Sequence, residues 1–541
     1  MNKVAHYLQE HLLGEVTTNS EVRRYFAFDK SILHLAPAIV AYPRTEEDIR
    51  KTANFCWQLA KRGQIIPITP RGAGTDTSGA AIGPGIMLVF PAHLNKILNL
   101  DVKKKTIAVE PGVTYDVLTQ TLFSHQLFLP PQPNQTYATI GGGVANNSFG
   151  EKSVKYGPTK KYVRSLRVVL ANGEVIETGP LNKRELSRKM GLTTFEGEIY
   201  RALDKLLEEN QQIIQESRDR FTHIANSAGY NIFGVKSNDN FDLTPLIVGS
   251  QGTLAVISEA TLAVENHNPQ TTLCLASLPK LDSLAELLPQ IKQLKPSVLD
   301  FINQPALQLI ASLNPNELTD FPTDLNSAIH LIIEFDHQKS GQQKDALKKL
   351  DRLITSADGT LAASTNPSEQ AEILKIKQSP ATIVNFTKGP AKAVPVAEAV
   401  AVPDNQVYEY LRRAYDTYHK VGLPPAAWGQ IGSGIVRFQP LLDLAKVSDR
   451  QKLFKISDSL YSLAVKFGGS ITAGAGDGRL RAPYLKLQYG ESLLSIMQAV
   501  KKIFDPYGLL NPGVKTATPA EVKGLMRTDY SPGRHFEHLY R

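Results

Sequence analysis

The most constraining feature of the chain is a glycine-rich loop between two short apolar runs. The loop reads RGAGTDTSGA over residues 71–80, after QIIPI at 64–68 and before GIMLVF at 85–90. Both apolar runs predict strands, whereas the phosphate loops of P-loop and Rossmann folds open a helix. Glycines permit close approach of the backbone to a ligand, and consecutive N–H groups form an anion nest. We therefore expect a phosphate-binding loop that belongs to neither of those two folds.

Length and composition describe a soluble protein of several domains. The chain has 541 residues, of which 42% are hydrophobic and 21% charged, and this length predicts roughly three to four domains of about 150 residues. The net charge is +8, but the 60 Lys and Arg residues are spread along the chain, so we expect no nucleic acid partner. No apolar run reaches the roughly 18 residues of a membrane span, and the N-terminus lacks a signal-peptide pattern. These features predict a cytoplasmic protein and leave peripheral contact with an acidic membrane face open.

Local patterns predict alternating helices and strands in the first 265 residues. Thr45 is placed to cap a helix over 43–63, and Asn172-Gly173 predicts a type I′ hairpin within 163–179. The remaining expected elements are a strand at 106–112, a helix at 114–125, a single helix at 196–217, and a strand, turn and strand over 245–262.

Three glycine motifs in a fixed order carry a resemblance to a known family. They are PRGAGTDTSGA at 70–80, TIGGGVANNSFGEKSVKYG at 139–157 and VGSQGTLAVISEATL at 248–262, with AIVAYPRTEEDI upstream and VKKIFDPYGLLNPGVK downstream. This arrangement resembles the vanillyl-alcohol-oxidase-type flavoproteins, and within them the FAD-linked D-2-hydroxyacid (D-lactate, glycolate, D-2-hydroxyglutarate) dehydrogenases. The resemblance implies an α+β, two-domain flavoprotein: a FAD-binding domain with two small α/β subdomains, plus an α+β cap domain. It places the FAD-binding domain at 1–265, the cap with a C-terminal segment returning to the flavin at 266–515, and a polar tail at 516–541.

The resemblance also assigns residues to the cofactor, FAD. The first loop would cradle the pyrophosphate, the second motif would bracket the flavin and its ribityl chain, and the third would meet the adenosine. Because the first loop contains no His and neither Cys56 nor Cys274 matches an attachment site, we expect the FAD to be bound non-covalently. The expected cofactor-binding residues are Arg71, Gly72, Ala73, Gly74, Thr75, Asp76, Ser78, Gly79, Thr139, Ile140, Gly141, Gly142, Ala145, Asn146, Asn147, Gly150, Tyr156, Gly157, Gln251, Gly252, Thr253, Ile257 and Asn511.

The second half of the chain departs from the family's metal motifs. WGQIGSGIVRF and TAGAGDGRLRAP lie where the dehydrogenases carry two histidine ligands, a carboxylate ligand and a catalytic histidine. Gln430 and Arg437 occupy the ligand-histidine positions, Gly474 the carboxylate position and Ala475 the position of the base. We therefore expect no metal.

The residues that replace this chemistry stay open at the level of sequence. Lys377 stands where the family has an arginine for the substrate carboxylate, and Arg479 and Tyr156 complete the candidate catalytic set. Further candidates, for each of which surface exposure, packing or a turn is the alternative, are Lys388, Tyr230, Glu398 and Asp477.

These observations predict a FAD-dependent oxidoreductase that acts on a small hydroxylated, anionic substrate. Two separate cysteines exclude an iron–sulfur cluster within this chain, so electrons would leave to a separate protein, a quinone or oxygen. Two alternatives remain: a sugar or alcohol oxidase of the same superfamily, and a non-catalytic flavin-binding subunit of a redox complex.

Overall fold

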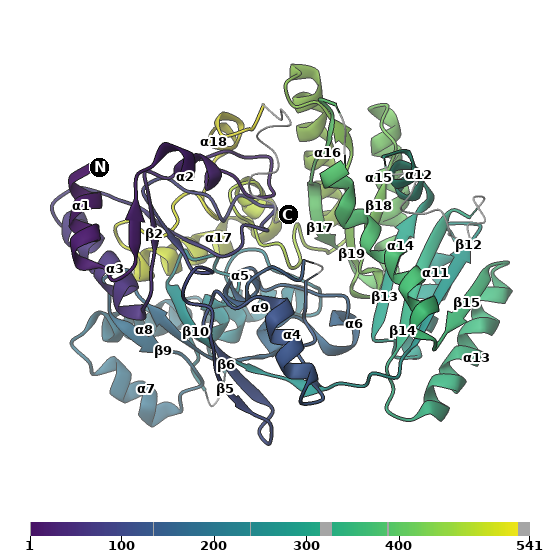
Figure 1. The fold of residues 1–541 in the computed structure, drawn as a ribbon, viewed down its shortest axis with the longest axis horizontal. Coiled ribbons are helices and arrows are strands. Elements are labelled where there is room, and N and C mark those ends of the chain that lie inside the picture. The colour runs from purple at the N-terminus through teal and green to yellow at the C-terminus, as the bar shows by residue number, and fades with distance from the viewer. Residues whose placement is uncertain (1, 134, 238–239, 314–326, 387–388, 529–541) are drawn as a thin grey trace.

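The computed structural model describes residues 2–133, 135–237, 240–313, 327–386 and 389–528. Figure 1 shows two lobes: the purple-to-blue N-terminal half on one side and a green sheet with its helices on the other. The yellow C-terminal helices lie with the N-terminal half, so the chain leaves the first lobe, builds the second and returns.

The glycine-rich loop connects two parallel strands of a small mixed sheet. Strands β2, β4 and β3 are parallel, and β1 pairs antiparallel with β2. The expected strand–loop–strand is confirmed, although the first strand begins only at Ile68, the last residue of the expected run. The helix capped by Thr45 is also confirmed, because the Thr45 side chain accepts from the Asp48 N–H. The bounds are β1 Glu15–Thr17, β2 Ile39–Tyr42, α3 Glu46–Ala60, β3 Ile68–Arg71 and β4 Ile86–Val89.

A five-stranded antiparallel sheet forms the second part of the first lobe. Its order is β5-β6-β10-β8-β9, and β8 and β9 form the expected hairpin. The turn is not type I′, because Gly173 (φ 89°) has a positive φ and Asn172 does not. The loop is instead of the three-residue kind, with glycine in the left-handed position. The bounds are β5 Ile97–Asp101, β6 Thr106–Val109, β8 Val163–Val169, β9 Val175–Glu177 and β10 Val256–Ala263.

Two expectations for the following segments are wrong. The single helix expected over 196–217 is two helices that break at Asn210, which ends the first and begins the second. The strand expected at the start of 245–262 is a short helix, because Pro245 occupies its first turn, where proline is favoured. The bounds are α4 Tyr115–Phe123, α5 Ile140–Asn146, α6 Ser153–Tyr156, α7 Lys183–Met190, α8 Phe195–Glu209, α9 Gln211–Thr222 and α10 Thr244–Ile247.

A seven-stranded antiparallel sheet forms the second lobe, with helices on both faces. Side chains alternate between the faces along a strand, so Leu273 and Leu275 of β12 pack against α12 and α14. Cys274 and Ala276 point to the other face, against α11, α13 and α15. The strands in spatial order are β15 Thr360–Ser364, β12 Thr272–Leu278, β14 Ile329–Phe335, β13 Val298–Asn303, β18 Ala427–Gly429, β19 Ile435–Phe438 and β17 Val396–Ala401. The helices are α11 Leu284–Gln293, α12 Gln304–Leu313, α13 Ser340–Ser356, α14 Pro367–Phe386, α15 Val407–Lys420 and α16 Val447–Lys466.

The C-terminal segment docks on the first lobe. After α17 (Leu485–Phe504), Leu510 forms a bridge with Ile68 at the start of β3. The segment expected to be a polar tail is partly structured: α18 (Pro519–Gly524) has a capping box, and Met526 bridges to Leu33. Residues 529–541 lie outside the described part of the chain. The division at residue 265 stays a prediction. The remaining short elements are α1 Asn2–His11, α2 Ser20–Tyr25, β7 Leu127–Phe128, β11 Glu265–Asn266, β16 Lys392–Ala393 and β20 Leu441–Leu442.

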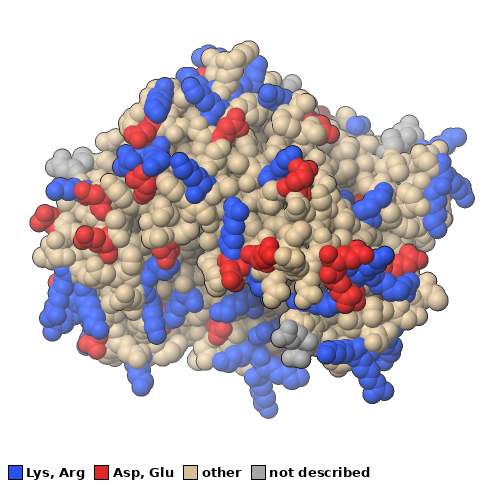
Figure 2. Space-filling view, turned by 180° about the vertical axis from the view of Figure 1, so that it is seen from behind, with Lys and Arg blue, Asp and Glu red and all other residues tan. Residues whose placement is uncertain are grey.

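The surface carries mixed charge. Figure 2 shows Lys and Arg side chains over the whole of one face, most densely along its lower edge, with Asp and Glu among them. Within the described ranges, no helix combines the length and the apolar character that crossing a bilayer requires.

Candidate functional site

A cavity that is partly open to solvent lies where the two lobes meet. The loop after β3, the N-terminal turn of α5 and the turn before β10 form its walls in the first lobe. The second lobe closes one end with side chains from β17 and β19 and with the turn at 474–475. The three glycine motifs, which are far apart in sequence, therefore meet around one space.

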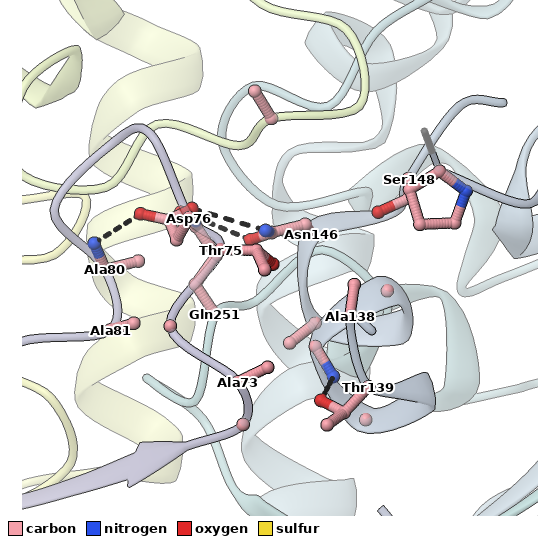
Figure 3. Close-up of a pocket in the computed structure, with 18 of the residues that line it drawn as sticks. Ala73, Thr75, Asp76, Ala80, Ala81, Ala138, Thr139, Asn146, Ser148 and Gln251 are labelled. Atoms are coloured by element: carbon pink, nitrogen blue, oxygen red, sulfur yellow. Dashed lines mark hydrogen bonds between the residues drawn. The ribbon is translucent and has the colours of Figure 1, made fainter. Parts of the chain in front are cut away.

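Asp76 holds the glycine loop in shape from within. Its carboxylate accepts from the backbone N–H groups of Ser78 (2.9 Å) and Ala80 (2.8 Å). It also accepts from the Asn146 side-chain amide of α5 (3.3 Å), which in turn accepts from Gln251 (2.8 Å). Figure 3 shows Asp76 between Ala80 and Asn146 at the cavity. One carboxylate thus links all three motifs, since Gln251 belongs to the third.

Arg71 supports the same loop from behind. It is 3% exposed, and its guanidinium donates to the carbonyls of Phe28 (2.7 Å) and Ala81 (2.9 Å). The backbone at Gly74 is left-handed, with φ 72°, and lies against the Arg71 side chain. A Cβ at this position would lie 2.1 Å from the Arg71 Nη2 atom. Both the left-handed backbone and this contact require glycine.

The second motif forms a short helix rather than a plain loop. Thr139 caps α5 by accepting from the Gly142 N–H (3.3 Å), and Gly141, Gly142 and Gly143 line the cavity. The N–H groups of Ile140 and Gly141 donate to the carbonyls of Val113 (2.8 Å) and Pro111 (2.9 Å), so the first turn of α5 is already hydrogen-bonded within the protein. The backbone donors that remain for a ligand are those of the β3–β4 loop.

The residues around the cavity fit FAD. Part of the wall is apolar, with Phe90, Pro111, Ala255 and Ile257, and suits a ring. The glycine loop offers its backbone N–H groups, which suit a pyrophosphate. Of the expected cofactor-binding residues, those that line the cavity are Arg71, Gly72, Ala73, Gly74, Thr75, Asp76, Thr139, Gly141, Gly142, Ala145, Asn146, Gln251, Gly252 and Ile257.

The other expected cofactor residues surround this wall without lining it. Asn511 is fully buried, and its amide donates to the carbonyls of Ala80 (2.9 Å) and Gln251 (2.8 Å), so it ties two motifs together. The expected cofactor residues that do not line the cavity are Ser78, Gly79, Ile140, Asn147, Gly150, Tyr156, Gly157, Thr253 and Asn511. Sequence reasoning missed the lining residues that lie outside the three motifs, such as Phe90 and Pro111.

The far end of the cavity carries three polar side chains from the second lobe. Arg437 on β19 donates from Nε to Glu398 on β17 (3.1 Å) and from Nη1 to the amide oxygen of Gln430. Gly474 and Ala475 lie beside them. This cluster brings together four positions that the sequence marks as departures from the dehydrogenase motifs, and it contains Glu398, one of the further candidates from the sequence.

The cluster does not fit a divalent metal ion. Arg437 brings a cation and Gln430 only a neutral amide, whose oxygen already accepts from Arg437. A carboxylate side chain at 474 is also excluded, because a Cβ there would lie 2.7 Å from the Phe149 backbone nitrogen at φ 82°. In the described part of the chain, no group of three His, Cys, Asp or Glu side chains is placed to hold a metal.

The three candidate catalytic residues do not line this cavity. Arg479 is 2% exposed and donates to the carbonyls of Gly79, Ile82 and Pro512, which favours a structural role. Lys377 forms an ion pair with Glu151, across from α14 to the first lobe.

Tyr156 also serves the contact between the lobes. It donates to Asp336 (2.7 Å) at the end of β14, and burial together with this carboxylate raises the pKa of its hydroxyl. It therefore stays protonated and engaged at physiological pH.

The remaining candidates have similar outcomes. Asp477 is fully buried and accepts from Lys515 (2.6 Å) and from the Gly229 N–H (2.8 Å). Tyr230 shares a hydrogen bond with Thr253 (2.7 Å), and burial raises the pKa of its hydroxyl. Lys388 lies outside the described residues.

Two buried carboxyl groups have strongly raised pKa values. Burial raises the pKa of Asp300 on β13 to about 8. Burial and the nearby Asp76 raise the pKa of Asp29 to about 7. Because their pKa values are raised, both carboxyl groups are largely protonated in slightly acidic solution. Neither of them lines the cavity.

Two family models match the chain. The FAD binding domain matches residues 37–179, and the C-terminal domain of FAD linked oxidases matches residues 267–514. Together they include the three polar residues at the far end of the cavity and the first two glycine motifs.

Relatives with curated names include dehydrogenases of D-2-hydroxy acids and a glycolate oxidase subunit. The chain is 29% identical to D-2-hydroxyglutarate dehydrogenase of Escherichia coli over 521 residues, which are 93% of this chain and 50% of that protein. It spans about half the length of the first such relatives it matches. It is 27% identical to glycolate oxidase subunit GlcD of Bacillus subtilis, with 90% of both chains covered. It is 25% identical to D-lactate dehydrogenase of Anaerostipes hadrus, with 92% of this chain and 94% of that protein covered.

Solved structures share the fold. The structure of p-cresol methylhydroxylase matches with a TM-score of 0.69 at 15% identity, covering 96% of this chain and 97% of that chain. Alkyldihydroxyacetonephosphate synthase matches with a TM-score of 0.64 at 16% identity, covering 95% and 84%. The expected two-domain architecture is confirmed.

Proposed function

The chain belongs to the FAD-linked oxidoreductases with the vanillyl-alcohol-oxidase-type fold, and on this premise we propose that it oxidises a small hydroxylated, anionic molecule without a metal ion. One observation carries the proposal: a single cavity joins the glycine motifs of the FAD-binding lobe to the Glu398–Arg437–Gln430 cluster. Bound FAD would accept two electrons from the substrate. The cluster is the polar wall that the second lobe offers to a substrate.

The residues of the chain have separate tasks in this function. The backbone of the glycine loop would hold the pyrophosphate, and Asp76 holds this loop against α5 through Asn146. The apolar part of the wall would take a ring of the cofactor. Polar side chains at the other end would orient the hydroxyl group of the substrate, since two of them, Arg437 and Gln430, can donate hydrogen bonds.

The FAD is proposed to be dissociable. No His, Cys or Tyr side chain is among the described residues that line the cavity. The proposed substrates are 2-hydroxy acids of the kind named for the relatives, and the proposed electron acceptor is a separate protein, a quinone or oxygen. The proposed location is cytoplasmic.

Purification and anaerobic titration test the function. The protein should purify yellow and release free FAD on acid precipitation, and glycolate, D-lactate or D-2-hydroxyglutarate should bleach the flavin without added metal. A protein that binds no FAD would refute the proposal. Tight FAD binding without bleaching by any of a wider set of hydroxy acids, sugars and alcohols would favour the non-catalytic subunit instead.

A further inference from the structure

An unusual stretch of backbone presents Glu398 to the cavity. Ala397 and Ala399, on either side of it, have φ values of 47° and 56°. Strand β17 pairs with β19 at Val396 and again at Val400, and the residues between them bulge away from the regular ladder. Left-handed conformations cost energy for alanine and cluster at functional sites.

Arg437 is fixed at two of its three nitrogens. Nε donates to Glu398 and Nη1 donates to Gln430, which is itself 3% exposed. Within the described residues, Nη2 has no hydrogen-bond partner, and Arg437 lines the cavity. The guanidinium is therefore oriented by protein contacts and keeps one amino group for a ligand.

We propose that Glu398 accepts the hydroxyl proton of the substrate while Arg437 donates a hydrogen bond to the same oxygen. This assignment rests on the proposed function. In the reaction, the O–H bond breaks and its proton moves to a Glu398 carboxylate oxygen. FAD, when bound, would accept the carbon-bound hydrogen with its two electrons as hydride, and the C–O bond would become C=O. The oxygen gains negative charge as the proton leaves, and the cationic donor stabilises that charge.

Arg437 and Glu398 together perform the two tasks that a metal ion and a histidine perform in the related motifs. A metal polarises the oxygen and a base takes the proton. Here a guanidinium polarises the oxygen and a carboxylate takes the proton. The positive charge of Arg437 lies where the related motifs place the metal ion, so this site needs no metal to polarise the oxygen.

Other carboxylates and hydroxyls of this region are less suited to the role. Asp477 is fully buried against Lys515, and Tyr156 is committed to Asp336. Asp300 is close enough to Arg437 to feel its charge, but it does not line the cavity. The charge of Glu398 contributes to the raised pKa of Tyr461 on α16. Asp300 and Tyr461 must therefore be considered when a pH profile is interpreted.

Binding separates the role of Arg437 from that of Glu398. Oxalate, a small dianion, should shift the absorbance of the oxidised holoprotein on titration. Arg437→Met should weaken oxalate binding about 30-fold or more, a loss within the range for a charged hydrogen bond, with Arg437→Lys intermediate. Glu398→Gln should bind oxalate at least as tightly as the wild type, because a negative charge is removed. Equal oxalate binding by wild type and Arg437→Met, both with full FAD content, would overturn the role of Arg437.

Anaerobic flavin reduction then tests the base. Glu398→Gln keeps an acceptor for Arg437 but loses the carboxylate, so its reduction rate should fall about 10²- to 10⁴-fold, while substrate binding changes little. Asp300→Asn is the matched control and should retain the wild-type rate. Reduction of Glu398→Gln at near the wild-type rate, or loss of reduction in Asp300→Asn instead, would overturn the assignment and leave the proposed function standing. A wild-type holoprotein that no hydroxy acid reduces would remove the base role from Glu398 together with the proposed function.

Discussion

The buried carboxyl of Asp300 should make the stability of the protein fall as pH rises. Asp300 lies on β13, is 6% exposed, and its Oδ1 atom has no hydrogen-bond partner in the described structure. Burial raises its pKa from 3.8 to about 8, and Glu334 adds to the rise, while Arg437 opposes it. Between these two values the unfolded chain loses the proton and the folded protein keeps it.

The sign and size of the effect follow from proton linkage. The folded state binds more protons in this window, so the unfolding free energy decreases with pH, by about 1.4 kcal/mol per pH unit. Between pH 5 and pH 7 the wild type should lose about 3 kcal/mol from this group. Asp300→Asn cannot titrate, so its stability relative to the wild type should increase by the same amount over that interval.

Urea titrations of the wild type and Asp300→Asn at pH 5, 6 and 7, followed by circular dichroism, measure this difference. Asp351→Asn, on the exposed face of α13, is the control and should run parallel to the wild type. If Asp300→Asn also runs parallel to the wild type, the carboxyl is ionised in the folded protein and the reasoning from burial is refuted.

Three further perturbations test the site. Gly74→Val should abolish FAD binding, since its Cβ would meet Arg71 and the backbone has φ 72°; Gly341→Ala, with open space around it, should keep the flavin released on acid precipitation, and retained flavin in Gly74→Val would contradict the model of the loop. Arg479→Met should lower the unfolding free energy by on the order of 3 kcal/mol because it removes donors from three backbone carbonyls, whereas unchanged urea midpoints would return this residue to the catalytic candidates. Metal analysis should find no stoichiometric divalent ion, and flavin reduction should survive chelation; a chelator-sensitive reaction with about one metal per chain would show a site built from other residues.

Sequence reasoning succeeded where a local signal decides the structure. The loop at 71–80 lies between two strands because short apolar runs flank it, and Thr45 caps α3 because its hydroxyl lies at the first turn. The break at Asn210 was missed because the amphipathic pattern continues across it. The short helix at Thr244–Ile247 was missed because PLIV has the composition of a strand and only the proline indicates a helix start.

The positions of the charged residues could not be predicted in the same way. Lys377 and Tyr156 pair with Glu151 and Asp336, which lie far from them in sequence. Such contacts depend on how the lobes dock, and no local pattern encodes that. Glu398 is presented by a bulge whose left-handed alanines have no sequence signature.

The sequence GDGR at residues 476–479 matches the dehydrogenase motif, although the metal-binding and base positions before it do not, and its structural contacts explain why. Gly478 lies so close to the glycine loop that a Cβ would be 2.1 Å from the Ser78 carbonyl oxygen. Arg479 donates to the carbonyls around that loop, and Asp477 fixes Lys515. These residues join the returning C-terminal segment to the glycine loop of this chain, so their loss would disturb that loop. Of the two neighbouring positions that face the cavity, Gly474 has no room for a side chain, because Phe149 lies too close and its φ is 82°. Ala475 is therefore the position that can change with the reaction. Matching the frame therefore predicts where the flavin is held, and the residues that face the cavity decide what chemistry is done there.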